Sequence, residues 1–139
     1  MKIYSLFTVF IFSFLFAGCG DMIKGKGEAE KKIPEFHALF NEEKFDEIYD
    51  SADPEFQKTA SKEKFREFIS AIHRKLGKVA STTNQGWKIN NFNLKTYVNM
   101  QQETTYESGK ATETFTYMME DGKPVLHGYH ISSADLIIK

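Results

Sequence analysis

The segment that most constrains the fold is a run of alternating side chains on both sides of an Asp-Gly pair. It extends from Ala111 to Ser133, with Asp121 and Gly122 at its centre. Asp-Gly suits the two-residue turn of a β-hairpin, because both turn positions need a positive φ. The sequence therefore predicts two antiparallel strands joined at residues 120–123, which we expect at the centre of a curved sheet.

Pairing counted outward from the turns predicts which residues share a face. The Asp121-Gly122 turn sets Glu113 opposite His130, and a second turn at Ser108-Gly109 sets Thr104 opposite Glu113. Residues directly opposite each other lie on the same face of a sheet. One end of this face is apolar, and its members are Val98, Met100, Phe115, Tyr117, Met119 and Leu126.

The other face is expected to be solvated. Its polar members are Asn99, Gln101, Glu103, Thr112, Thr114 and Thr116. Val125, Tyr129 and Ile131 fall on this face as well, and a bulge in the last strand would turn such residues inward.

The sequence before the strands predicts helices. Pro34 suits a first helical turn, Asn41 suits the N-cap of a second helix, and Asp53 precedes another helix start at Pro54. Ser61 begins the most regular helix, which ends at Gly77 and whose apolar stripe consists of Phe65, Phe68, Ile69, Ile72 and Leu76.

From Lys78 the apolar period changes to two. Residues 79–83 and 87–92 predict a first strand broken near residues 84–86, and residues 94–107 predict a second. Helices followed by consecutive strands indicate an α+β fold, with N-terminal helices packed on one face of a curved four-stranded antiparallel sheet. We expect residues 33–139 to form this single domain.

The N-terminus indicates export. Residues 1–18 contain one positive residue, Lys2, and an apolar run from Ile3 to Phe16, which is typical of a signal peptide. The run ends in Phe16-Ala17-Gly18-Cys19, which resembles the lipobox of bacterial lipoproteins, where the cysteine is lipidated and becomes residue one. The alternative is an ordinary secretory signal peptide followed by an incidental cysteine.

A lipidated Cys19 implies anchoring to the membrane rather than spanning it. Several acyl chains hold a protein on a bilayer where a single chain is marginal. Residues 20–32 are rich in Gly, Lys and Glu, so we expect residues 19–32 to consist of the lipidated cysteine and a flexible tether. Gly20 stands where an aspartate would suggest retention in the inner membrane of enterobacteria, so the expected location is the cell envelope, with the outer membrane favoured.

Composition excludes several classes of function. The chain has a formal net charge of −1, whereas a nucleic-acid-binding domain is normally basic. Its single cysteine would be consumed by lipidation, which excludes disulfides, cysteine nucleophiles and cysteine metal ligands. No motif for a cofactor or a metal is present, and His127 and His130 would lie on opposite faces of a strand.

Several segments match a known group of sequences. They are Leu76-Gly77-Lys78-Val79, residues 109–115, Asp121-Gly122 and Gly128-Tyr129-His130-Ile131. With them, residues 65–133 resemble uncharacterised bacterial families known only as domains of unknown function, which look like relatives of the nuclear transport factor two and cystatin superfolds. The resemblance implies a helix-covered, strongly bent sheet and assigns no site residues.

The best polar cluster predicted from the pairing is Glu113 with His130, flanked by Thr104, Tyr106 and Tyr117. In a water-poor pocket a carboxylate beside an imidazole can act as general base, with a tyrosine stabilising an oxyanion. The alternatives are a ligand-binding role and a structural pair whose members satisfy each other. His37 has no evident partner in the sequence.

We therefore expect a lipid-anchored envelope domain that binds a partner protein or a small ligand and is not an enzyme. The alternative is a small isomerase or dehydratase that uses the Glu, His and Tyr cluster in a cone-shaped pocket. A surface interaction protein would instead expose an apolar patch, for which Tyr129 and Ile131 are the candidates.

Overall fold

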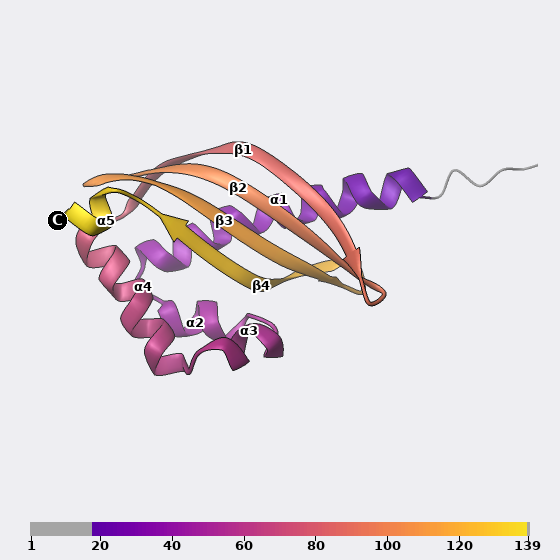
Figure 1. The fold of residues 1–139 in the computed structure, drawn as a ribbon, viewed down its shortest axis with the longest axis horizontal. Helices are drawn as coiled ribbons and strands as arrows, with labels where there is room; N and C mark the ends of the chain where they lie inside the picture. The colour runs from indigo at the N-terminus through magenta and orange to yellow at the C-terminus, as the bar shows by residue number, and fades with distance from the viewer. Residues whose placement is uncertain (1–17, 139) are drawn as a thin grey trace, which may run out of the picture.

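The computed structural model describes residues 18–138, and Figure 1 shows their arrangement. Helices come first and strands follow. The elements are α1 (Gly18–Asn41), α2 (Phe45–Asp50), α3 (Pro54–Thr59), α4 (Lys62–Leu76), β1 (Val79–Phe92), β2 (Lys95–Tyr106), β3 (Gly109–Glu120), β4 (Lys123–Ser132) and α5 (Asp135–Ile138). The predicted α+β class is confirmed, and the antiparallel sheet is not closed.

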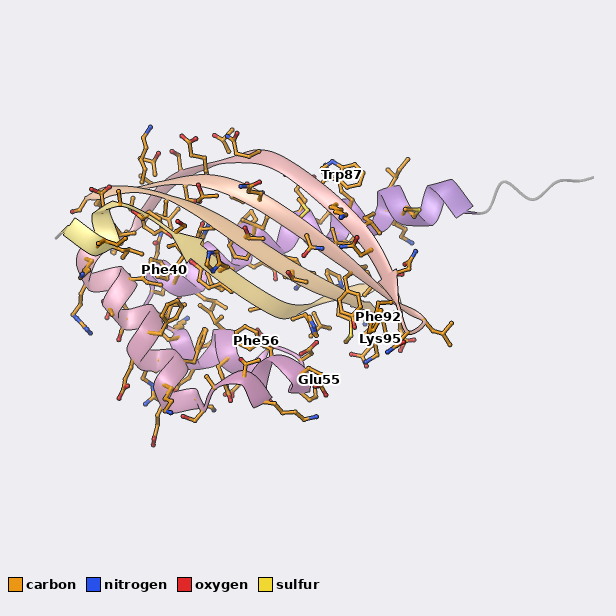
Figure 2. The ribbon with its side chains drawn as sticks, viewed as in Figure 1. Phe40, Glu55, Phe56, Trp87, Phe92 and Lys95 are labelled. Atoms are coloured by element: carbon orange, nitrogen blue, oxygen red, sulfur yellow. The ribbon has the colours of Figure 1, made fainter. Side chains whose placement is uncertain are left out.

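The four strands lie in the order β1-β2-β3-β4 and curve over the helices. The long helix α1 contacts all four strands, whereas α2, α3 and α4 form a group beside β4. Buried side chains between these layers form one hydrophobic core. From the helices it includes Ile33, Phe36, Phe40, Ile48, Phe56, Phe65, Ile69 and Leu76, and from the strands Val98, Met100, Phe115, Tyr117 and Leu126. Figure 2 shows Phe40 and Phe56 within this layer.

The expectation of a flexible tether at residues 19–32 is wrong, because these residues belong to α1. Ala29 is fully buried in the core, and Ile33 follows it one turn later. An ion pair joins Lys26 to Glu30 with 2.7 Å between Nζ and Oε2. Burial of one stripe and pairs at i,i+4 stabilise a helix that Gly-rich composition alone would not predict.

Local signals for three helix ends are confirmed. The Asp53 carboxylate accepts a hydrogen bond from the Phe56 N–H, and the Ser61 hydroxyl accepts one from the Lys64 N–H. Gly77, with φ of 77°, ends α4. The prediction that Asn41 is an N-cap is wrong: it ends α1, and its side chain bonds to both the N–H and the C=O of Val79.

The strand turns match the prediction at one corner only. Asp121 and Gly122 both have a positive φ, and Tyr117 lies opposite Leu126 as predicted. The other turn is at residues 107–108 rather than 108–109, so Thr104 pairs with Ala111 instead of Glu113. This shift is two residues in register, which leaves every side chain on its predicted face because the strand period is two.

A bulge in β4 overturns the predicted partner of Glu113. Thr116 pairs with Gly128 and Tyr117 pairs with Leu126, so His127 is an extra residue. Beyond it, Thr114 pairs with His130, and Glu113 pairs with Ile131. One inserted residue reverses the faces of all residues that follow it. Glu113 and His130 therefore lie on opposite faces, and the predicted pair between them is wrong.

β1 is one continuous strand rather than a broken one. The predicted break at residues 84–86 is a register shift between Asn84 and Gly86. Most of the predicted signal peptide, residues 1–17, lies outside the described residues, and the side chain of Cys19 is not described. Among the helices that are described, none has the length and apolar character needed to cross a membrane.

Candidate functional site

Glu113 is the centre of a buried polar cluster. It lies on the inner face of β3 and is 0% exposed. Thr104 and Tyr106 face it from β2, Tyr129 faces it from β4, and His37 reaches it from α1. Three consecutive strands and the remote helix α1 thus meet at one carboxylate.

Each oxygen of the Glu113 carboxylate has two partners. Oε1 accepts hydrogen bonds from the hydroxyls of Tyr106 at 2.8 Å and Tyr129 at 2.6 Å. Oε2 accepts one from the Thr104 hydroxyl at 2.5 Å and lies 2.7 Å from His37 Nε2. A carboxylate can accept about four such bonds, so its acceptor capacity is filled.

The surroundings keep Glu113 ionised. Burial by itself would raise the pKa of its carboxyl, but the hydrogen bond and charge of His37, with the hydroxyls of Thr104 and Tyr129, lower the pKa below its ordinary value. Because an ionised carboxylate only accepts hydrogen bonds, the proton in the contact with His37 belongs to Nε2. His37 is therefore a donor.

The tyrosines of the cluster stay protonated. Burial, together with the nearby charge of Glu113, raises the pKa of Tyr106 and of Tyr129 well above the ordinary value. Their hydroxyls therefore keep their protons at neutral pH and donate them in hydrogen bonds to the carboxylate. Thr104 is supported in turn by Thr82 of β1, whose Oγ1 lies 2.9 Å from the Thr104 hydroxyl, so all four strands take part.

Three of the five predicted pocket residues meet as expected, and two do not. Glu113, Thr104 and Tyr106 are in contact. His130 is exposed on the outer face of β4. Tyr117 is buried but is not among the residues bonded to the carboxylate. It stacks on Phe115 and lines a separate hollow of about 150 Å³ between α1, α2 and the first residues of β4.

Sequence reasoning missed His37 and Tyr129. The sequence offers no partner for His37, although His37 follows Ile33 by four residues and precedes Phe40 by three, which is the spacing of a buried helix face. Regular alternation puts Tyr129 on the outer face, because the bulge at His127 has no signal in the local composition. The alternation of Tyr129 with Ile131 was the only sign that the face had changed.

A second histidine-carboxylate contact lies at the bulge itself. His127 Nδ1 is 2.5 Å from Asp53 Oδ2, and the imidazole packs against the ring of Tyr97 with centroids 5.0 Å apart. Asp53 also caps α3, and its N–H donates to the carbonyl of Leu126. This pair therefore joins the helices to the edge of the sheet, and it holds the bulge in place.

These contacts do not assemble a metal site. Within residues 18–138, no three His, Cys, Asp or Glu side chains are grouped so that they could hold a metal ion. The four partners of Glu113 also include only one further ligand-type side chain, His37, because the others are hydroxyls.

An open groove lies at the other end of the sheet's inner face. It has a volume of about 390 Å³ and separates the first turns of α1 from the strands. Its lining is mostly apolar and consists of Met22, Lys24, Gly25, Ile89, Thr96, Val98, Met119 and Gly122. Small-molecule sites are commonly concave, mainly apolar and of about this volume, with few polar groups.

Together, the fold and site define an α+β domain with a closed polar centre and an open apolar groove. The chain belongs to the family described as "Protein of unknown function (DUF4019)", whose model matches residues 34–129. This match covers more than half of the chain, from the C-terminal half of α1 to Tyr129 in β4. A search of curated proteins found no match.

Proposed function

We propose that this chain is a membrane-anchored domain of the cell envelope that binds a small apolar ligand without catalysing a reaction. The observation that carries the proposal is the groove under α1, an open cavity of about 390 Å³ lined mainly by apolar side chains. Lys24 at its rim is exposed and favours a ligand with an anionic group, such as a fatty acid.

Glu113 supports the non-catalytic part of the proposal. A general base must reach a substrate proton and must have a free lone pair to accept it. Glu113 is fully buried, and four donors already occupy its two oxygens. A carboxylate in this setting stabilises the fold rather than reacting.

The anchoring part rests on the sequence. The apolar run Ile3–Phe16, followed by Ala17, Gly18 and the single cysteine, is the pattern of a lipoprotein signal peptide. We propose diacylglyceryl and palmitoyl chains on Cys19. Because α1 includes this position, the lipid would connect to the domain through a helix instead of a loose tether.

Ligand binding is tested with a photoreactive dodecanoate that carries a diazirine, added to the full chain in membranes. We expect saturable labelling of peptides containing Met22 or Met119, displaced by unlabelled dodecanoate. Gly25→Leu should abolish this labelling, because a Cβ at Gly25 would already lie 3.7 Å from the Met119 side chain and a larger group would fill the groove.

Gly27→Leu is the matched control, because no atom lies within 4 Å of a Cβ built at Gly27. It adds the same side chain to the same helix outside the groove and should leave the labelling unchanged. Equal labelling in both variants, or labelling that unlabelled dodecanoate does not displace, would refute the groove as a ligand site.

Anchoring is tested by replacing the cysteine. Cys19→Ser should move the protein from the membrane fraction to the soluble fraction or leave it unprocessed, and mass spectrometry of the wild-type N-terminal peptide should find acyl chains on Cys19. Gly27→Ala retains the cysteine and should stay in the membrane fraction. A wild-type N-terminal peptide without acyl chains would overturn the proposal of lipidation.

A further inference from the structure

Large apolar side chains are exposed at one end of the long axis of the molecule. Met22 and Ile23 are in the first turns of α1, and Phe92 and Leu94 are at the turn between β1 and β2. Figure 1 shows the start of α1 and the tip of the β1–β2 hairpin at the same end of the long axis, opposite the C-terminus. The groove lining connects these parts, because it includes residues of α1, β1 and β2.

The exposure at this end is far greater than folding requires. Leu94 is 107% exposed, Ile23 is 69% exposed and Phe92 is 66% exposed. Figure 2 shows Phe92 and Lys95 at the hairpin tip. Single exposed apolar residues are ordinary, but a group of them at one end of a small domain indicates a contact surface.

The backbone conformation of the β1–β2 turn is a second reason to regard the exposed Leu94 as part of a contact surface. Asn93 has φ of 49° and Leu94 has φ of 62°, so both turn residues are left-handed. Asn tolerates this conformation, whereas the second position favours glycine. The β3–β4 turn of the same chain has Asp121 and Gly122 at φ of 49° and 75°. At the β1–β2 turn a leucine stands in the place of that glycine, at a backbone cost, and its side chain faces solvent.

The proposed lipid anchor identifies what covers this surface. The proposed lipid site, Cys19, lies in the first turn of α1, so the membrane anchor is at the end of the molecule that carries Ile23 and Leu94. Exposed lysines Lys24 and Lys95 stand beside these apolar residues. Apolar side chains flanked by lysines suit a lipid bilayer, with the lysines among anionic headgroups.

We propose that the β1–β2 tip inserts Phe92 and Leu94 into the bilayer that holds the N-terminal anchor. The domain then contacts the membrane at two points, the start of α1 and the hairpin tip, and its orientation on the membrane is fixed. This inference rests on the proposed anchoring and adds a second contact that does not depend on the identity of the groove ligand.

The single tryptophan of the chain allows a direct test. Trp87→Phe removes the native fluorophore, and Leu94→Trp then places one at the tip. The full-length variant is reconstituted into vesicles of phosphatidylethanolamine and phosphatidylglycerol with brominated acyl chains, which quench tryptophan by contact. We expect strong quenching and blue-shifted emission, because the new side chain is among acyl chains.

The matched control is Ile137→Trp in the same Trp87→Phe background. Ile137 is 85% exposed and lies in α5, at the opposite end of the molecule. Its tryptophan should not be quenched. Quenching at both positions would overturn a contact specific to the tip, and blue-shifted emission at position 94 without quenching would mean burial against protein instead of lipid.

Flotation of the same vesicles separates this inference from the proposed function. If the protein floats with the vesicles but Leu94→Trp is not quenched, the anchor is retained and the tip contact is refuted. If the protein does not float at all, the anchoring and the inference that rests on it are both refuted.

Discussion

Glu113 illustrates how one buried charge is made tolerable. Moving an isolated carboxylate out of water costs many kcal/mol, and the cost falls only when donors replace the lost water. Here two hydroxyls bond to one oxygen, and a hydroxyl and an imidazole bond to the other. The donors come from α1, β2 and β4, so the charge is satisfied only when these elements are assembled.

Replacing this carboxylate should therefore destabilise the protein strongly. Glu113→Gln keeps the shape of the side chain, but its amide NH2 group would point at hydroxyl or imidazole donors and could not accept their hydrogen bonds. We therefore expect the free energy of unfolding to fall by about 2–4 kcal/mol. Urea denaturation measures it. Glu103→Gln, on the exposed side of β2, is the control and should change stability by less than about 0.5 kcal/mol. Equal effects of the two substitutions would contradict the role of Glu113.

The lowered pKa of Glu113 also predicts a dependence on pH. Since its pKa is below the ordinary value of 4.5 in the folded state, the carboxylate stabilises the fold fully above that value. This contribution is lost as the pH falls through the folded-state pKa. The free energy of unfolding, measured by urea denaturation from pH 7 to pH 3, should fall more steeply in the wild type than in Glu113→Gln. Parallel curves would mean that Glu113 is not ionised in the folded protein.

At the scale of elements, the bulge in β4 decides which residues reach the core. If position 127 were an ordinary paired residue, Tyr129 and Ile131 would lie on the outer face, and Glu113 would lose one donor. His127 is held by Asp53 at the start of α3, so a helix cap and a strand irregularity stabilise each other.

Deleting His127 should cost little more than substituting it. The deletion restores regular pairing and leaves Tyr129 opposite Phe115 on the inner face, so the contact with Asp53 is lost but the Glu113 cluster is kept. His127→Ala keeps the bulge and removes only the contact with Asp53, at a cost of about 1–3 kcal/mol. Circular dichroism and urea denaturation compare the two variants. Loss of the folded state in the deletion variant alone would mean that the bend at the bulge is itself required for the fold.

The helix α1 gives another prediction at this scale. Gly27→Ala should raise the free energy of unfolding by about 0.5–1 kcal/mol, because alanine favours a helix and its Cβ meets no other atom. Gly77→Ala should instead destabilise, since φ is 77° and a Cβ there would lie 2.5 Å from Glu107 Oε2. Thermal denaturation measures both. No effect of Gly27→Ala would mean that this part of α1 does not contribute to stability.

The features of the fold that the sequence could predict are those set by local signals. Signals that act within one turn, such as Asp53, Ser61, Gly77 and Asp121-Gly122, located helix ends and a hairpin correctly. Glu113, Thr104 and Tyr106 were placed together because a shift of two residues preserves the face.

What could not be predicted depends on contacts between distant segments. Residues 19–32 are helical because Ala29 packs into the core, which composition does not reveal. His37 meets Glu113 across 76 positions of sequence, and no periodic pattern encodes that pairing. The bulge at His127 is stabilised by Asp53, which is equally remote.

For the whole molecule, the cluster divides the inner face into two regions of different character. Around Glu113 most side chains are buried, and both carboxylate oxygens have their hydrogen-bond partners. Toward the hairpin tips the same face opens into the groove, and apolar side chains remain exposed. A rigid centre that carries an open, apolar end is suited to hold a binding surface against a membrane, as we propose.

The rigid centre should make the whole molecule unfold as one unit, and a double-mutant cycle can measure this coupling. His37→Ala removes the donor from α1, and Tyr129→Phe removes one from β4. When one donor is lost, the carboxylate is more easily protonated, and its hydrogen bond to the other donor becomes weaker. The loss of stability in the double variant should therefore be smaller than the sum of the losses in the two single variants, by about 0.5–3 kcal/mol. Urea denaturation of the four proteins gives this coupling energy.

The control cycle combines Tyr129→Phe with Arg66→Ala. Arg66 bonds to Asp46 on the exposed side of α2 and α4 and shares no described partner with Tyr129. These two effects should add within about 0.5 kcal/mol, as for independent sites. If the His37 and Tyr129 effects also add, the helix and the last strand are bound to Glu113 independently, and the carboxylate does not join them into one cooperative unit.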